Sequence, residues 1–244
     1  MNLLIDSGNS FIKWAQQIDA KLTPVRRCHS KAVASLHDVW NGYDVPERVI
    51  IANVAGNSIA SEINHTVSEL WHVDAEFVAS SRNCCGLTNS YHSPGQLGVD
   101  RWMAMAAAFQ SASDPVIVVD CGTAVTIDLV NEEGLFVGGV IMPGLNTSFQ
   151  SLRAGTEAVE DMNSITKDIS PVAQSTEDGV AIGVLLGIVG GIERVIREQS
   201  SQIDKAPAVF ITGGDAKKLL PYLAIPAILQ PDLVLEGLRI FSSE

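Results

Sequence analysis

The chain has 244 residues, of which 46% are hydrophobic and 18% are charged, and this composition excludes a disordered protein. Its formal net charge of −12 is opposite in sign to a surface that binds nucleic acid or anionic lipid, so we expect neither partner. The first residues lack the basic segment of a signal peptide, and the weakly polar stretch 179–192 is too short and too rich in glycine for a membrane span. These features favour a cytoplasmic protein.

The four cysteines are Cys28, Cys84, Cys85 and Cys121, and they show no metal-binding C-x-x-C spacing. Adjacent Cys84 and Cys85 are poorly placed to bond to each other or to share a metal. We therefore expect reduced thiols, as in a cytoplasm.

Two segments of the chain repeat one pattern, in which an apolar strand ends in Asp-x-Gly and a second apolar strand follows. The first copy, residues 3–15, contains Asp6-Ser7-Gly8-Asn9-Ser10, and the second, residues 118–130, contains Asp120-Cys121-Gly122-Thr123. Each copy predicts a strand, a tight turn and a returning strand. The repeat indicates two related lobes.

The remaining elements alternate between strands and helices in both halves of the chain. After the first turn, the patterns predict a strand over 48–54, a helix over 58–71, a strand over 75–79, an irregular loop over 80–97 and a helix over 99–110. After the second turn, they predict a strand over 136–141, helices over 143–153 and 175–199, a strand over 208–212 with a short helix behind it, and finally a short strand and a last helix. Ser, Ala and Pro at 111–115 indicate the boundary, which gives an N-terminal lobe over 1–113 and a C-terminal lobe over 114–244.

The two Asp-x-Gly turns have the chemistry of phosphate binding. Glycine lets the backbone approach a phosphate, hydroxyl and amide groups donate to its oxygens, and Asp at a strand end can hold a hydrated metal ion. Asp, Gly and Asn also favour ordinary turns for conformational reasons. Two copies at equivalent positions favour phosphate binding over plain turns.

Two further features can serve the same ligand. Lys13 follows the first turn on the strand face of Phe11 and Ala15, where it can reach a phosphate or extend to solvent as an edge lysine, and both interpretations stay open. The turn Thr212-Gly213-Gly214 lies between a strand and a helix, which makes it a candidate wall for a base and ribose.

These residues resemble a known superfamily. The segments 6–10, 120–126 and 212–214 resemble the two phosphate motifs and the adenosine motif of the acetate and sugar kinase, Hsp70 and actin superfamily. Within it, Gly98-Val99-Asp100-Arg101 and Asn89-Ser90-Tyr91 are similar to type III pantothenate kinases. The resemblance implies an α/β fold of two tandem RNase H-like (actin-like ATPase) lobes, each a mixed sheet flanked by helices, with nucleotide in the cleft between them. It also implies ATP-dependent phosphorylation of pantothenate to 4′-phosphopantothenate, the first step of coenzyme A synthesis.

The resemblance further implies which residues form the site. Asp100 would be the general base for the pantothenate hydroxyl, although Asp at a helix start is also a common cap, and Arg101 would bind the pantothenate carboxylate. The substrate site would consist of Tyr91, Gly98, Val99, Asp100, Arg101 and Thr176. The ATP site would consist of Asp6, Ser7, Gly8, Asn9, Ser10, Phe11, Ile12, Lys13, Gly122, Thr123, Gly213 and Gly214.

Cations and a second copy of the chain belong to the same expectation. Asp120 would hold a monovalent cation, potassium or ammonium, and Mg²⁺ would accompany ATP near Asp6, directly or through water. Family members are homodimers in which the interface completes the pantothenate site. The glycines Gly179, Gly183, Gly187 and Gly191 lie on one helix face and predict close approach of another backbone, from the sheet or from a second copy. Thr176 also lies in a helix start, Ser175-Thr176-Glu177-Asp178, so it has a capping interpretation as well.

Three other functions fit parts of the pattern. A sugar or acyl kinase would keep the Asp-x-Gly turns but lack Gly-Val-Asp-Arg. A transcriptional regulator without enzymatic activity is opposed by the acidic charge. An actin-like or chaperone ATPase needs inserted subdomains, for which 244 residues leave little space.

Overall fold

The computed structural model describes residues 1–112, 114–154 and 170–244, which divide into two compact units. Unit 1 comprises Met1–Ser113, Val130–Gly138 and Asp232–Glu244, and unit 2 comprises Asp114–Leu129 and Gly139–Pro231. The lobes 1–113 and 114–244 stay a prediction, and residue 113 itself lies outside the described residues. The compact units use different chain segments because the last helix packs in unit 1.

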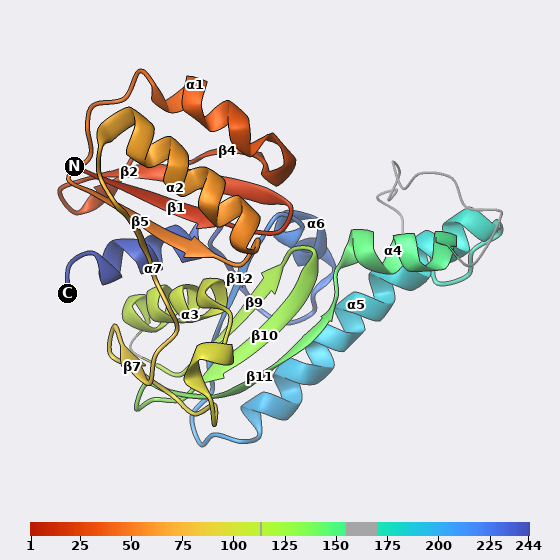
Figure 1. The fold of residues 1–244 in the computed structure, drawn as a ribbon. Coiled ribbons are helices and arrows are strands. Elements are labelled where there is room, and N and C mark those ends of the chain that lie inside the picture. Colours follow the sequence, from red (N-terminus) through yellow and green to blue (C-terminus); the bar gives the residue numbers. More distant parts are fainter. Residues whose placement is uncertain (113, 155–169) are drawn as a thin grey trace. The chain divides into compact units, whose positions relative to one another are not determined.

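Unit 1 is built on a mixed sheet with the strand order β3-β2-β1-β5-β6, in which β4 also pairs with β2 (Figure 1). Strand β1 is antiparallel to β2 and parallel to β5, as an Asp-x-Gly turn between β1 and β2 requires. The strands are β1 (Asn2–Ser7), β2 (Phe11–Ile18), β3 (Lys21–Leu22), β4 (Arg26–His29), β5 (Arg48–Asn53) and β6 (Ala75–Phe77).

The core of unit 1 lies between this sheet and short helices. A 3-10 segment (Ser30–Ser35), α1 (Leu36–Trp40) and α2 (Asn57–Trp71) contribute buried side chains, and α2 places Ile63 and Val67 against the sheet. The Trp40 ring lies 5.8 Å from the Trp14 ring, edge-on, and 5.9 Å from the Trp71 ring, stacked. Burial of these large side chains fixes the sheet that carries the first turn.

Helices α3 (Val99–Ser111) and α7 (Leu233–Phe241) pack together in unit 1. Their backbones come so close that a Cβ at Gly237 would collide with the Met103 carbonyl group, which explains the glycine. The Arg48 guanidinium also donates to the Ser242 carbonyl oxygen (2.9 Å). The C-terminal residues are therefore an integral part of unit 1.

The segment 80–97, predicted as an irregular loop, contains regular structure. Strands β7 (Asn83–Cys84) and β8 (Leu87–Asn89) form a hairpin, and a 3-10 turn (Pro94–Gln96) precedes α3. Leu135 and Phe136, the start of β11, pair with β8 within unit 1. The loop prediction was wrong here because the strands are too short to give a periodic pattern.

Unit 2 is built on strands in the order β13-β12-β9-β10-β11. Strands β9 and β12 are parallel, with Asp120 opposite Thr212. The strands are β9 (Val116–Cys121), β10 (Ala124–Val130), β11 (Leu135–Pro143), β12 (Ala208–Thr212) and β13 (Ile228–Leu229). The helices are α4 (Leu145–Ala154), α5 (Thr176–Ser200), α6 (Ala216–Leu219) and a 3-10 segment (Leu220–Tyr222).

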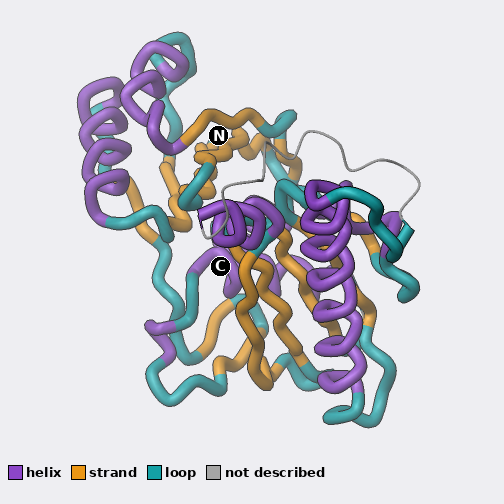
Figure 2. Tube along the Cα trace, turned by 90° about the vertical axis from the view of Figure 1, so that its right-hand side faces the viewer, coloured by secondary structure: helices purple, strands orange, loops and turns teal. Residues whose placement is uncertain are grey.

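Helix α5 runs along the strands of unit 2, and its first turns extend past them beside α4 (Figures 1 and 2). Its buried side chains, among them Leu185, Ile188 and Ile192, join the core formed by β9, β10 and β12. The helix has 25 residues, and an 18-residue window within it has a mean hydropathy of 1.9, so by length and composition alone it could cross a membrane. The core helix of a soluble protein passes the same test.

The glycines of α5 face different surroundings. A Cβ at Gly191 would meet the Met142 side chain at 3.2 Å, whereas a Cβ at Gly183 or Gly187 would meet no described atom within 4 Å. Within the described residues, Gly183 and Gly187 therefore do not pack against the sheet. Gly183, Leu186, Gly187 and Gly190 form an exposed stripe of one helix face.

The mixed sheets flanked by helices confirm the predicted α/β fold class.

Candidate active site

The first Asp-x-Gly turn joins β1 to β2 in unit 1. The Gly8 N–H donates to the Phe11 carbonyl (3.0 Å), and the Ser30 hydroxyl donates to the Gly8 carbonyl (2.7 Å). Asn9 and Ser10 are exposed at its tip, as a ligand-binding turn requires. The side chains of Ser7 and Ile12 are fully buried, so these two residues can meet a ligand only through their backbone.

Asp6 and Lys13 are register partners on β1 and β2, and Lys13 Nζ lies 3.5 Å from Asp6 Oδ2. Strand β2 is internal, with β1 on one side and β3 and β4 on the other, so Lys13 is not an edge lysine that extends to solvent. Its ammonium group lies at the first Asp-x-Gly turn, for which the sequence predicts phosphate binding.

The Asp6 carboxyl is 7% exposed and carries a shifted pKa. Burial raises its pKa to about 6, and the charges of Asp100 and Asp232 raise it as well, while Lys13 opposes the shift. Three carboxylates and one ammonium group of unit 1 therefore interact around the end of β1. This excess of negative charge suits a bound cation.

Asp100 lies in the first turn of α3, which begins after Gly98. Its Oδ1 accepts a hydrogen bond from the Arg101 N–H (2.8 Å), so it stabilises the helix start. Burial raises the pKa of Asp100, and Arg101 and Lys13 counteract that rise. A Cβ at Gly98 would lie 2.6 Å from Asp100 Oδ1, so only glycine leaves room for this carboxyl. Val99, between them, is buried.

Arg101 and Tyr91 lie together on Phe136. Arg101 is 7% exposed, and its Nη1 lies 3.5 Å from the Tyr91 hydroxyl. The Phe136 ring, on β11, lies 5.2 Å from the Tyr91 ring and 6.0 Å from Arg101 Cζ. Four predicted residues of unit 1, Asp6, Lys13, Asp100 and Arg101, thus interact, and Tyr91 joins them through Arg101.

The second Asp-x-Gly turn joins β9 to β10 in unit 2. The Gly122 N–H donates to the Ala124 carbonyl (2.9 Å), and the Thr123 carbonyl accepts from the Thr147 hydroxyl (2.6 Å). Asp120 closes strand β9, and Thr123 is exposed. As in the first turn, the glycine N–H donates to the first residue of the returning strand, but this turn is one residue shorter.

Gly213 and Gly214 follow β12, the neighbour of β9. Gly213 has a φ of +94°, and a Cβ there would collide with the Asp120 carboxylate and the Cys121 carbonyl. A Cβ at Gly214 would meet no described atom within 4 Å. The glycine turn of the third motif therefore lies directly against the second motif within unit 2.

Thr176 is the first residue of α5. The helix cap is Ser175, whose hydroxyl oxygen accepts from the Asp178 N–H (3.1 Å), so the capping interpretation belongs to Ser175. The Thr176 side chain is exposed on the part of α5 that extends beyond the strands (Figure 1). The structure does not bring Thr176 to the Asp120 turn within unit 2.

Sequence patterns missed two residues of unit 1. Asp232 precedes α7 and looks like an ordinary helix-start residue, yet its charge acts on Asp6. Phe136 looks like a core residue, and it is one, but it also supports Tyr91 and Arg101. No local signal could reveal either contact, because their partners lie far away in the chain.

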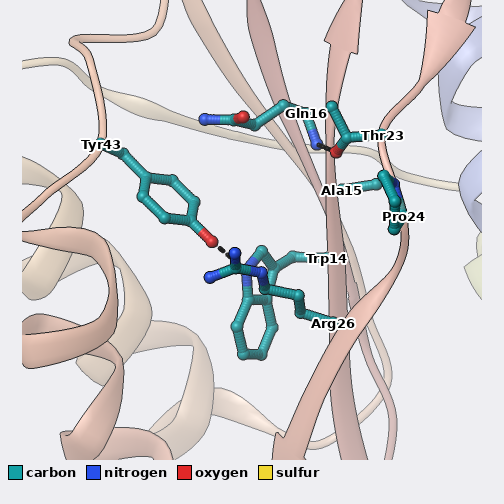
Figure 3. Close-up of a pocket in the computed structure, with 7 residues that line it drawn as sticks. All are labelled: Trp14, Ala15, Gln16, Thr23, Pro24, Arg26 and Tyr43. Atoms are coloured by element: carbon teal, nitrogen blue, oxygen red, sulfur yellow. Dashed lines mark hydrogen bonds between the residues drawn. The ribbon is translucent and has the colours of Figure 1, made fainter.

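A separate cavity of about 240 Å³ lies in unit 1 beside β2 (Figure 3). Trp14 Nε1 donates to the Tyr43 hydroxyl (3.2 Å), and the Arg26 guanidinium lies over the Tyr43 ring. Trp14 and Gln16 alternate with Lys13 along the strand, so the cavity lies on the face of β2 opposite to Lys13. None of the predicted site residues lines it.

Known proteins match the chain over nearly its full length. Residues 2–198 match the family model of type III pantothenate kinases. Among curated proteins, the type III pantothenate kinase of Nitrosococcus oceani is 33% identical over 98% of this chain and 92% of its own, and that of Dechloromonas aromatica is 34% identical over 98% of both. The enzyme of Nitrosomonas eutropha is 35% identical over 98% of this chain and 93% of its own.

Solved structures show a similar fold. A Campylobacter jejuni protein assigned to a Baf family of transcriptional activators has a TM-score of 0.61 at 22% identity, with 99% of this chain and 98% of that chain covered. The activator of 2-hydroxyisocaproyl-CoA dehydratase from Clostridium difficile, solved with ADPNP, has a TM-score of 0.54 at 10% identity, with 98% and 92% covered. The fold is therefore that of actin-like ATPases, and by its sequence the chain belongs to the type III pantothenate kinase family.

Proposed function

We propose that this protein transfers the γ-phosphoryl group of ATP to the primary hydroxyl of pantothenate, with Asp100 as general base. The product is 4′-phosphopantothenate, at the first step of coenzyme A synthesis. The observation that carries the proposal is the half-buried Asp100 carboxyl, which interacts with the charges of Arg101 and Lys13, in a chain whose relatives are named type III pantothenate kinases.

A general base needs a free lone pair and a pKa nearer to neutrality than an exposed carboxylate has. Asp100 meets both conditions, because a carboxylate has about four lone pairs, of which the Arg101 N–H occupies one, and burial raises its pKa. Arg101 and Lys13 oppose that rise and so favour the ionised carboxylate. In the reaction, Asp100 accepts the hydroxyl proton as the hydroxyl oxygen attacks the γ-phosphorus and the bond to the leaving ADP oxygen breaks.

Arg101 is the candidate partner of the pantothenate carboxylate. A guanidinium offers two parallel N–H donors to a carboxylate, and the Phe136 ring beneath it holds its plane. The Tyr91 hydroxyl can donate to the same group. Gly98 and Val99 would form the backbone next to the bound pantothenate. Thr176 would contact the substrate from α5.

The two Asp-x-Gly turns and Gly213-Gly214 would hold ATP. The exposed side chains of Asn9, Ser10 and Thr123 offer donors to phosphate oxygens, Gly8 and Gly122 let the backbone come close to them, and Phe11 borders the first turn. Lys13 would neutralise phosphate charge, and its exposed side-chain fraction of 25% leaves the ammonium group reachable. The backbone at Gly214 is open enough for a base or ribose to pack on it.

Residues of unit 1 fit Mg²⁺. The Asp6 carboxylate is a hard oxygen ligand whose burial and neighbouring carboxylates disfavour its charge, and a cation would relieve that cost. Asp6 would hold the ion directly or through water. Bound there with ATP, Mg²⁺ would neutralise phosphate charge.

Residues of unit 2 fit a monovalent cation. Gly213 leaves a space that a Cβ would fill, and the Asp120 carboxylate and the Cys121 carbonyl oxygen border it. An all-oxygen set of this kind suits potassium or ammonium. The ion would add positive charge near the phosphates in a protein of net charge −12.

We further propose a homodimer in the cytoplasm. The stripe of Gly183, Leu186, Gly187 and Gly190 is exposed, and glycines at this spacing allow a second helix backbone to approach closely. A second copy would then complete the substrate site. The packing of α5 in the core of unit 2 supports a cytoplasmic location, because a membrane-spanning helix would present those side chains to lipid.

The test is pantothenate-dependent ADP release by the purified chain with Mg-ATP, in potassium or in sodium, for wild type and Asp100→Asn. We expect turnover that needs potassium and a kcat of Asp100→Asn lower by about 100-fold or more. Asp74→Asn, an exposed aspartate of unit 1, is the matched control and should keep wild-type activity. Circular dichroism verifies that each variant is folded.

A well-folded wild type without pantothenate-dependent turnover in either salt would overturn the proposal. A regulator that kept the nucleotide fold would then be the better interpretation. A wild-type kcat in Asp100→Asn would contradict only the role of Asp100 as general base and would leave the proposed kinase activity in place.

A further inference from the structure

Two adjacent cysteines and a carboxylate converge in unit 1, away from the residues assigned to catalysis. Cys84 Sγ lies 3.2 Å from Cys85 Sγ and 3.7 Å from Glu244 Oε2, and the ligand atoms of all three residues lie within 4.8 Å of one another. The two sulfurs therefore lie closer together than we expected for adjacent cysteines, which the sequence indicated to be poorly placed to share a metal.

The hairpin turn explains how adjacent side chains converge. Cys85 and Gly86 are the central residues of the turn between β7 and β8, with φ values of +54° and +76°. Both values are positive, as in a type I′ turn, which favours Asn or Gly at the first position. A cysteine there costs about 1 kcal/mol of backbone strain, so its presence calls for a chemical reason.

The turn is held firmly. The Thr88 N–H donates to the Gly134 carbonyl (2.9 Å), and a Cβ at Gly134 would lie 2.6 Å from the Gly86 carbonyl oxygen. Cys85 is only 1% exposed, whereas Cys84 is half-buried and Glu244 exposed. A small ion can therefore reach the site from the side of Cys84 and Glu244.

We propose that Cys84, Cys85 and Glu244 form a binding site for a thiophilic divalent cation, Zn²⁺ or Cd²⁺, with a fourth position open to water.

The distances fit tetrahedral coordination. With Zn–S of about 2.3 Å and Zn–O of about 2.1 Å, two sulfurs should lie about 3.8 Å apart and a sulfur and a carboxylate oxygen about 3.6 Å apart. The Cys84–Glu244 distance of 3.7 Å already has this value, and the two sulfurs need to separate only slightly by side-chain rotation. Two thiolates with one carboxylate match the preference of zinc and cadmium over magnesium or calcium.

The two thiols are hydrogen-bonded to each other, which lowers the pKa of Cys84 and raises that of Cys85 far above its ordinary value. A metal binds thiolates, so loading should release protons and should strengthen as pH rises.

The test is titration of the reduced, full chain with Cd²⁺, followed by the ultraviolet thiolate-to-metal band and by equilibrium dialysis. We expect one ion per chain, loss of the band in Cys84→Ser and in Cys85→Ser, and an affinity about tenfold weaker in Glu244→Gln. Zn²⁺ should compete for the same site. Cys28→Ser, which removes another half-buried thiol of unit 1, is the matched control and should bind as wild type does.

Cys85→Ser alters a buried turn residue, so Cys84→Ser, at a half-buried position, is the deciding variant. Retention of the band in folded Cys84→Ser would overturn the site, and so would non-saturating binding to wild type. Formation of a Cys84–Cys85 disulfide in mild peroxide by a chain that binds no Cd²⁺ when reduced would also overturn it. None of these results depends on kinase activity.

Discussion

Asp6 on β1 and Lys13 on β2 are direct register partners, and their charged groups lie 3.5 Å apart at the end of the strand pair. The charges of Asp100 and Asp232 also act on Asp6, so the carboxylate is only partly neutralised by Lys13. The protein thus holds a negative charge that a bound cation would stabilise.

This relationship predicts a pH dependence of stability. The pKa of Asp6 is raised from 3.8 to about 6 in the folded state, so its contribution is most favourable below pH 3.8 and is lost as pH rises through about 6. Without Mg²⁺, the free energy of unfolding of Asp6→Asn relative to wild type should increase by about 1 kcal/mol between pH 5 and pH 7. Urea unfolding at both pH values measures this difference. A pH-independent difference would show that Asp6 is not perturbed.

The paired N–H donors of Arg101 predict that its substitution weakens the binding of pantothenate but not of ATP. Arg101→Lys keeps the charge but loses the paired donors of the guanidinium, which lies over the Phe136 ring, so the KM for pantothenate should rise by about 10-fold to 100-fold, with a smaller change in kcat. Steady-state kinetics with varied pantothenate provides the measurement. Arg194→Lys, an exposed arginine of α5, is the control and should leave the KM unchanged. An equal loss in the KM for ATP would argue against a role in pantothenate binding.

Gly213 and Gly214, which follow β12, should differ sharply in how well they tolerate substitution by alanine. Gly213→Ala forces a side chain into positive φ and against Asp120, so it should lower the free energy of unfolding by about 2 kcal/mol. Gly214→Ala enters open space and should change it by less than about 0.5 kcal/mol. Denaturant unfolding of both variants tests the contrast, and similar values for the two would contradict the geometry of this turn.

The exposed glycines of α5 predict the oligomeric state. Gly187→Leu should convert a dimer into a monomer, because the larger side chain prevents close approach of a second helix while leucine suits the helix itself. Light scattering across a concentration series measures the mass. Ser61→Leu, on the exposed face of α2, is the control. A monomeric wild type, or an unchanged dimer of Gly187→Leu, would rule out this interface.

Local patterns were sufficient for the parts of the site that are local in the chain. The Asp-x-Gly turns at Asp6 and Asp120 were predictable because a strand, its terminal acid and a glycine turn all lie within a few residues. The start of α3 was predictable from Gly98 and Asp100 for the same reason.

The remaining features depend on contacts between distant segments. Asp232 acts on Asp6 only because α7 returns to unit 1, and Phe136 supports Arg101 only because β11 begins beside β8. The convergence of Cys84 and Cys85 depends on a turn with two positive φ values, which cysteine itself does not signal. Sequence periodicity carries no information about these three arrangements.

The packing of α7 on α3 has a consequence for synthesis on the ribosome. Translation delivers residues 1–112 first, yet the unit that they form lacks the partner of α3 until the segment Asp232–Glu244 has been made. The apolar surface of α3 that α7 covers is therefore exposed to solvent while the whole of unit 2 is translated. We expect nascent chains to be most dependent on chaperones during that interval, and the earliest complete unit in the growing polypeptide to be the second one.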